Sequence, residues 1–163
     1  MLSLFRRDPD EGWLYREAWY DEGAGEFVVH HGKAGANGKL TAEKAPAEEA
    51  DSLLESFAAQ CAEDGYADPA EEDLSSLTVS YPLKGSTPNA SEQRNANAVH
   101  HAVLIALAWR GLGALSDPEQ QDHEGGQALV MQAKTVHARK AAEAAAAAVK
   151  STDVPSSKVE ITR

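Results

Sequence analysis

Hydrophobic and aromatic residues in the first 45 positions occur in short runs that glycine-bearing segments separate. WLYREAWY at 13–20 and EFVVH at 26–30 are rich in aromatic and β-branched residues, and DEGAG lies between them. Two such runs around a glycine-bearing loop are typical of a β-hairpin. Three further glycines between positions 32 and 38 indicate positive-φ turns that lead into a third strand near 39–44.

The spacing of apolar residues becomes helical after Pro46. One stripe recurs at steps of three and four residues, as in an amphipathic helix, and consists of Ala50, Leu53, Leu54, Phe57, Ala58 and Cys61. Pro46 suits the start of this helix, Gly65 suits its end, and Tyr66 is positioned for a contact at the C-cap. Because Cys61 belongs to the stripe, we predict that it is a small core residue and not a reactive thiol.

The second half alternates strands with helices. It follows ADPAEEDLSS, a segment whose proline, acids and serines are typical of a linker. Strands are predicted at 77–83, 127–135 and 158–163, helices at 91–109 and 136–150, and a polar loop at 114–126.

These elements predict an α+β protein of two modules. Residues 11–68 form a small antiparallel sheet with one helix, residues 69–76 form a linker, and residues 77–163 form a β-α-β-α-β module with ferredoxin-like character. We expect the second module to be a three-stranded sheet that two helices cover on one face. The βαβ step from 77–83 to 127–135 allows part of that sheet to be parallel.

The aromatic residues indicate where the cores lie. Because side chains alternate along a strand, one face of the first run carries Trp13, Tyr15, Glu17 and Trp19. With Phe27 and Val29, these residues are predicted to form the small core of the front module. An exposed aromatic strip that serves a partner is the alternative. Trp109 ends the long helix and is predicted to pack against the second sheet.

The distribution of charge separates the two halves more sharply than the patterning does. The chain of 163 residues has a formal net charge of −11. Residues 1–76 hold 6 Lys and Arg against 18 Asp and Glu, whereas residues 77–163 hold 9 against 8. An acidic front half repels phosphate backbones and favours basic protein partners.

The sequence also bears on the compartment. Cys61 is the one cysteine, so no internal disulfide forms. MLSLFRRDPDEG lacks the features of a signal peptide, and no run has the length of a membrane span. We therefore expect a soluble cytoplasmic protein with no membrane partner. We predict a frayed or docked start of the chain, with a short surface anchor from Leu2 to Arg7 as the weaker alternative.

The six histidines are the first candidates for metal binding. His30 and His31 are adjacent in a strand, so they point to opposite faces and cannot bind one metal together. His100 and His101 lie about 100° apart around a helix, which is also unsuited to a joint site. HExxH, CxxC and similar spacings are lacking. We predict no metal.

The remaining polar motifs favour no catalytic machinery. The acids and the histidine of residues 117–124 are of the right type for a hard cation, but they lack the ordered spacing of a calcium loop. No serine lies in a nucleophile turn, and Gly111-Leu112-Gly113 follows a helix instead of opening one after a strand. We predict no catalytic residues and no cofactor.

The turn after the second strand carries a resemblance to a known module. His31-Gly32-Lys33 is followed by Ala34-Gly35 and Asn37-Gly38, and an amphipathic helix comes afterwards. This order resembles the WGR domain, which is named for its Trp-Gly-Arg motif. His31 stands at the tryptophan position and Lys33 at the arginine position. Lysine keeps the charge of arginine but lacks its planar fork.

The resemblance extends to a group of small bacterial proteins in which a Tyr-Arg-Glu strand leads to a Glu-His-Trp-Gly turn. YREAWYDEGAGEFVVHHGKAG is similar to that segment, and GLGALSDPEQQDHEGGQALVMQAKT is similar to a segment of their second half. In poly(ADP-ribose) polymerases, the WGR domain helps to bind DNA ends and relays that binding to a catalytic domain. The resemblance thus implies a WGR-like fold, with binding residues His31, Gly32, Lys33, Gly35 and Arg16.

Two functions from different classes follow. The favoured one is a non-catalytic interaction or regulatory protein whose acidic front half docks a basic protein partner, with immunity or antitoxin-like neutralisation as one form. The alternative is a nucleic-acid-binding module of WGR type that uses Lys33 and the turn around it. The acidity of the front half favours the first hypothesis, because it repels nucleic acid.

Overall fold

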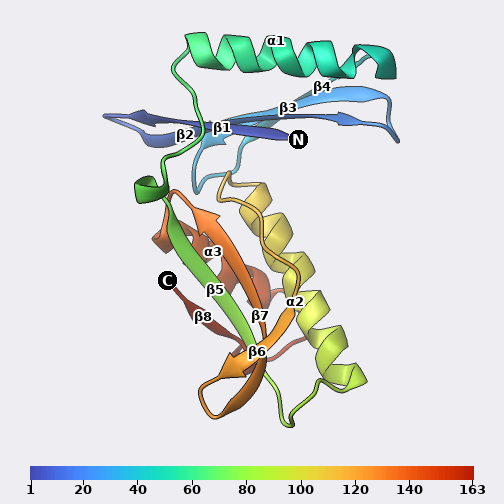
Figure 1. Cartoon of the computed structure of the whole chain (residues 1–163), viewed down its shortest axis with the longest axis vertical. Coiled ribbons are helices and arrows are strands. Elements are labelled where there is room, and N and C mark those ends of the chain that lie inside the picture. The colour runs from blue at the N-terminus through green and yellow to red at the C-terminus, as the bar shows by residue number, and fades with distance from the viewer.

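The computed structural model describes residues 1–163 and has two sheets and three α-helices (Figure 1). The strands are β1 (Leu2–Asp8), β2 (Gly12–Asp21), β3 (Glu26–Lys33), β4 (Lys39–Lys44), β5 (Ser75–Pro82), β6 (Glu119–His123), β7 (Gly126–Thr135) and β8 (Glu160–Thr162). The helices are α1 (Ala50–Glu63), α2 (Ala90–Ala108) and α3 (Ala138–Lys150). The predicted α+β class is confirmed.

The front module, called module 1 below, is an antiparallel meander in the order β1-β2-β3-β4, with α1 across its outer face (Figure 1). The strands predicted at 13–20, 26–30 and 39–44 are present. We predicted a frayed or docked start of the chain, and it is docked: residues 2–8 form an additional strand, β1, which pairs along β2 from Leu2 opposite Ala18 to Asp8 opposite Gly12. LSLF alternates as a strand does, but the run is too short to indicate one by itself.

Helix α1 confirms the predicted apolar stripe. Cys61 is buried and packs with Leu4 and Tyr66. Gly65, at φ +80°, ends the helix in the left-handed conformation that glycine favours. The Tyr66 N–H then donates to the Cys61 carbonyl at 2.8 Å. Burial raises the pKa of the Cys61 thiol, which keeps it protonated as a core residue.

The second module, module 2, has the order β-α-β-β-α-β, and its sheet runs β6-β7-β5-β8. Every neighbouring pair is antiparallel. This is the split βαβ arrangement of ferredoxin-like folds, as the predicted character implied. Our expectation of three strands was wrong, because a fourth strand, β6, lies in the predicted polar loop. The parallel arrangement that the βαβ step allowed is not found between neighbours, because β7 lies between β5 and β6. EQQDH, at the exposed edge, has no apolar alternation that would reveal a strand.

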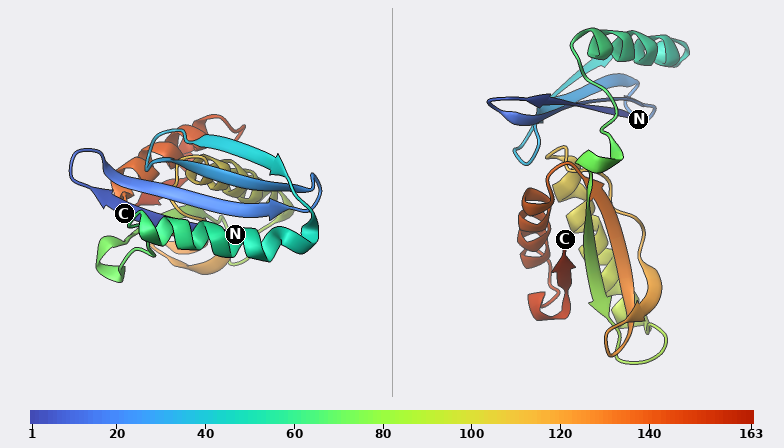
Figure 2. Two further views of the ribbon diagram at one scale, coloured as in Figure 1. Left: turned by 90° about the horizontal axis from the view of Figure 1, so that it is seen from above. Right: turned by 60° about the vertical axis from the view of Figure 1, so that its left-hand side comes forward.

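Helices α2 and α3 cover one face of the second sheet (Figure 2). Helix α2 begins with a capping box in which the Asn89 side chain accepts from the Glu92 N–H and the Glu92 carboxylate accepts from the Asn89 N–H. Its buried side chains recur at helical spacing and face the sheet: Ala96, Val99, Val103 and Leu107. Helix α3 buries mainly alanines, which lets it lie close to the sheet and to α2.

Module 1 lies across the end of module 2, so the order along the long axis is α1, the first sheet and then module 2 (Figures 1 and 2). Trp13 and Phe5, from the inner face of the first sheet, pack against the large core of module 2. The predicted core of module 1 was therefore wrong in part. Trp13, Tyr15, Glu17 and Trp19 face module 2, whereas strand pairing places Phe27 and Val29 on the α1 side.

None of the helices combines the length and the apolar character that a membrane span requires.

Candidate functional site

The turn that carries the WGR resemblance contacts module 2. The Gly35 N–H donates to the Arg110 carbonyl at 2.9 Å, and the Gly38 N–H donates to the Trp109 carbonyl at 3.2 Å. These two carbonyls follow the end of α2, where backbone acceptors lack helical partners. Gly35, at φ +90°, also lies directly against the side chain of Lys140. The turn therefore binds the backbone just after the end of α2, and this contact joins the two modules.

The other predicted binding residues divide between the two faces of the first sheet. Arg16 and His31 are cross-strand partners on the α1 side, whereas Gly32 lies opposite Tyr15 on the side of module 2. Arg16 is held by an ion pair with Asp64 and lies over the ring of Tyr66 at 4.3 Å. The Arg16 hydrogen bond lowers the pKa of the Asp64 carboxyl. Arg16 thus serves the packing of α1.

His31 and Lys33 are exposed on β3. Partial burial, with the charges of Lys39 and Arg16, lowers the pKa of His31, so its ring is neutral at pH 7. Lys33 makes no ion pair. Of the predicted set, Lys33 is the charged side chain that stays available to a partner.

A buried chain of polar side chains, called the polar chain below, crosses the inner face of the first sheet. The Ser3 hydroxyl donates to Glu17 Oε1 at 2.9 Å, His30 Nδ1 lies 3.1 Å from Glu17 Oε2, and His30 Nε2 lies 3.0 Å from the Tyr15 hydroxyl. Glu17 is 8% exposed and His30 is 3% exposed. The ring of Trp109 contacts the His30 ring edge to face at a centroid distance of 5.3 Å.

One tautomer of His30 satisfies the whole polar chain. With the proton on Nδ1, His30 donates to the Glu17 carboxylate and accepts from the Tyr15 hydroxyl at Nε2. Burial and the Glu17 charge raise the pKa of Tyr15, so its hydroxyl stays a donor. The Tyr15 side chain is fully buried, so no substrate reaches that hydroxyl. The polar chain therefore fixes the packing of β2 and β3 below Trp109.

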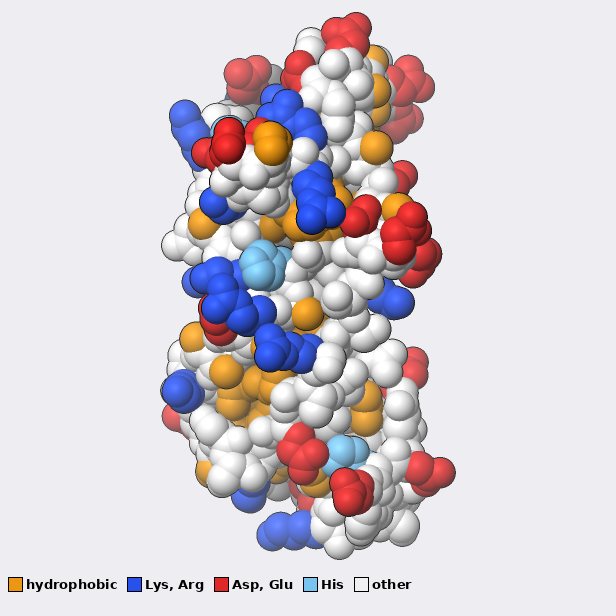
Figure 3. Space-filling model, turned by 90° about the vertical axis from the view of Figure 1, so that its left-hand side faces the viewer, with side chains coloured by type: hydrophobic (Ala, Val, Ile, Leu, Met, Phe, Trp, Pro, Cys, Tyr) orange, Lys and Arg blue, Asp and Glu red, His pale blue; other side chains and the backbone are white.

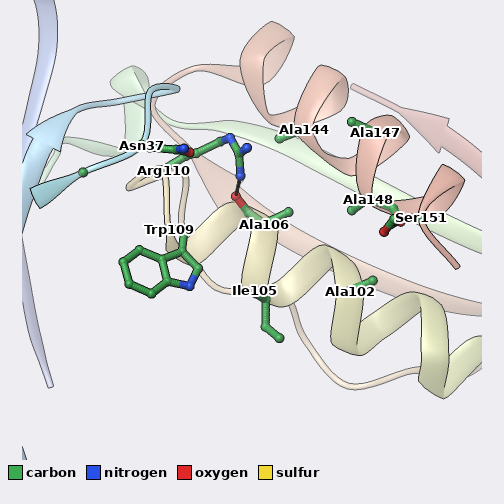
Figure 4. Close-up of a pocket in the computed structure, with 11 residues that line it drawn as sticks. Asn37, Ala102, Ile105, Ala106, Trp109, Arg110, Ala144, Ala147, Ala148 and Ser151 are labelled. Atoms are coloured by element: carbon green, nitrogen blue, oxygen red, sulfur yellow. Dashed lines mark hydrogen bonds between the residues drawn. The ribbon is translucent and has the colours of Figure 1, made fainter. Parts of the chain in front are cut away.

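We predicted that Trp109 packs against the second sheet, and this prediction was wrong. Leu107 is the last residue of the buried stripe of α2, and Trp109, two positions later, lies on nearly the opposite side of the helix. It is 47% exposed, and it separates two hollows at the module boundary. The larger hollow, called the α2–α3 groove below, has a volume of about 660 Å³ and lies between the two helices (Figure 4).

The outer face of α1 is acidic and lacks compensating cations. Every charged residue between Lys44 and Lys84 is an Asp or a Glu. Glu48, Glu49, Asp51, Glu55 and Glu63 are exposed and make no ion pair. We call these five residues the acidic face.

Basic side chains gather on another side of the molecule. Figure 3 shows Lys and Arg side chains spread along one face, from module 1 across the boundary to module 2. Arg7 lies over the ring of Trp13 at 5.9 Å, the Ala34 N–H next to Lys33 donates to the Trp13 carbonyl, and Lys140 lies against Gly35. Arg7 pairs with Asp73 at 3.9 Å and Lys140 pairs with Glu143 at 3.4 Å, so Lys33 is the one of these three side chains that makes no ion pair.

Metal-ligating side chains do not converge. No group of three or more His, Cys, Asp and Glu is arranged to hold an ion. His30 and His31 lie on opposite faces of β3, as predicted. In the 117–124 segment, His123 pairs with Glu160 at 2.9 Å, and Asp117 lies 3.7 Å from His100.

No protein-family model, curated protein or solved structure matches the chain. Its function is therefore inferred from its own residues.

Proposed function

We propose that the protein is a non-catalytic interaction protein whose acidic face docks a basic protein partner. The observation that carries this proposal is the row of exposed carboxylates on α1 and on the turn directly before it, with no lysine or arginine among them. Like charges held close together repel one another, and no ion pair within the chain relieves that repulsion. A basic partner relieves that repulsion and is steered by the field of the face.

The non-catalytic part of the proposal is supported by the polar chain. Its Tyr–His–Glu order resembles an activated nucleophile, but the tyrosine that would act is enclosed by the protein. Cys61, which is unpaired and buried, supports a cytoplasmic location for the protein.

Neutralising the acidic face is expected to weaken binding of a basic peptide. In a triple variant with Glu48→Gln, Asp51→Asn and Glu55→Gln, the affinity for a fluorescein-labelled Lys-Ala repeat peptide should fall about tenfold, because each exposed charge pair contributes roughly 0.5 kcal/mol. Fluorescence anisotropy at two salt concentrations measures this, and the wild-type affinity should fall as salt rises.

The matched control removes the same charge from module 2. Asp117→Asn, Glu119→Gln and Glu124→Gln change three exposed carboxylates at a distance from α1. Affinity should stay within about twofold of wild type, which is the spread expected of remote surface charges. Equal weakening in both triple variants would mean that net charge alone attracts the peptide, and it would overturn the proposal.

Nucleic-acid binding is the second candidate, and the Lys and Arg side chains along the face in Figure 3, together with the unpaired Lys33, favour it. We expect Lys33→Glu to weaken binding of a labelled nicked DNA duplex roughly fivefold at low salt, with a smaller salt dependence. Lys84→Glu, at the far end of module 2, is the control for net charge. Equal affinities of the two variants in an anisotropy titration would contradict this candidate.

A further inference from the structure

The exposed large hydrophobic side chains of this chain gather in one place. They are Met1, Leu40, Ile105 and Trp109. Ile105 and Trp109 line the α2–α3 groove, whereas Met1, Leu40 and Trp109 line the neighbouring hollow of about 270 Å³. Trp109 lines both, so the two hollows adjoin at its side chain. Apolar side chains exposed around adjoining hollows make this place a candidate interaction site.

The shape of the α2–α3 groove suits a helix. Ala102 and Ala106 of α2 lie opposite Ala144, Ala147 and Ala148 of α3, as Figure 4 shows. Small side chains on both walls let a third helix approach to a normal interhelical distance of about 8–10 Å. Residues 102–108, the last part of α2, span about 9 Å, which is somewhat less than two helical turns. The turn at Asn37 and Gly38 closes one end.

Charge determines which helix fits. Arg110 lies at the closed end of the groove, where its guanidinium donates to the Ala106 carbonyl at 2.9 Å (Figure 4). No carboxylate pairs with Arg110, and no Asp or Glu lines the groove. A half-buried guanidinium with free N–H groups beside an apolar floor is complementary to a carboxylate.

We propose that the α2–α3 groove binds an acidic amphipathic helix of a partner protein. Ile105 and Trp109 contact its apolar residues, and Arg110 pairs with an Asp or Glu of the helix. Trp and Arg together are the residue types that dominate binding at protein interfaces. This groove lies mainly on α2 and α3 of module 2, away from the acidic face. It selects an acidic partner segment, whereas the acidic face selects a basic one, so the two proposals succeed or fail separately.

The probe is a display library of helix-forming peptides of about 18 residues, long enough to be partly helical in water, with the exposed positions randomised. The full-length protein is the bait. We expect enriched peptides to carry apolar residues at i, i+3 or i+4, and i+7, with an Asp or Glu next to them. No enrichment, or enrichment of peptides without an acid, would overturn the proposal.

The strongest enriched peptide is then titrated against variants by fluorescence anisotropy. Ile105→Glu should weaken binding at least tenfold, and so should Arg110→Glu, whereas Arg94→Glu on the same helix should leave it within about twofold. Ile105 is 43% exposed, so its substitution leaves the fold intact. Ala147→Trp, which fills the groove from α3, is a second test that removes no contact of the fold. Unchanged affinity in Ile105→Glu and Ala147→Trp would contradict the proposed site.

A second copy of the chain is the competing occupant of the groove. Sedimentation velocity distinguishes it, because the proposal expects the wild-type protein and Ile105→Glu to sediment alike as monomers. A dimer that Ile105→Glu dissociates would assign the groove to self-association and overturn the proposal.

Discussion

His30→Ala is expected to lower the free energy of unfolding by about 3 kcal/mol, because it leaves the buried Glu17 carboxylate without its main partner. Glu17 would keep the Ser3 hydroxyl, and the Tyr15 hydroxyl would lose its acceptor. The substitution also removes a ring that contacts both Tyr15 and Trp109. Urea unfolding followed by circular dichroism measures the change.

The neighbouring histidine provides a matched control. His31 is exposed and lies on the opposite face of the same strand. His31→Ala makes the same chemical change one position away, and it should alter the free energy of unfolding by less than about 0.5 kcal/mol. A loss of less than about 1 kcal/mol in His30→Ala would mean that the polar chain contributes little to stability, and it would contradict the role given to it here.

Much of the fold follows from apolar spacing that the sequence displays. The stripe from Ala50 to Cys61 predicted α1 and its buried face, and the alternation of β3 placed His30 and His31 on opposite faces of the strand. Strand β6 was missed for a physical reason. Both of its faces meet solvent, so EQQDH needs no apolar residue and shows no period.

The candidate sites were harder to predict, because they depend on register and on the packing of the modules. Pairing of Asp21 with Glu26 sets Glu17 opposite His30, and only the structure of the loop between the strands gives that pairing. The resemblance to the WGR domain drew attention to the turn at Gly35 but not to what the turn contacts. That contact is the end of α2, which lies more than 70 residues further along the chain.

One signal for the α2–α3 groove was present in the sequence. The stripe Val99, Val103 and Leu107 continues to positions 110 and 111, so Trp109 falls outside it. A large aromatic residue off the buried stripe of a helix faces solvent or another module. Here it does both, because it covers His30 and lines two hollows.

Gly111→Ala is expected to disrupt the module boundary and to lower the free energy of unfolding by about 3–4 kcal/mol. Gly111 has φ +56°, a conformation that costs a non-glycine residue about 1–2 kcal/mol. A Cβ there would also overlap the ring of Tyr15, and overpacking of this kind adds about 1–3 kcal/mol. Tyr15 is fully buried and bonded to His30, so it cannot turn away without breaking the polar chain.

Gly12→Ala separates the two causes. Gly12 has a similar left-handed conformation, φ +82°, but its Cβ would meet nothing within 4 Å. Gly12→Ala should therefore lower the free energy of unfolding only by the cost of the left-handed conformation, which is about 1 kcal/mol. Urea unfolding compares the two variants.

Tryptophan emission reports on the boundary, because Trp13 packs on the core of module 2 and Trp19 and Trp109 line one hollow there. Only Gly111→Ala should change the native emission. Equal losses of stability with unchanged emission would show that Tyr15 tolerates the added methyl group, and the boundary would then be looser than the polar chain implies.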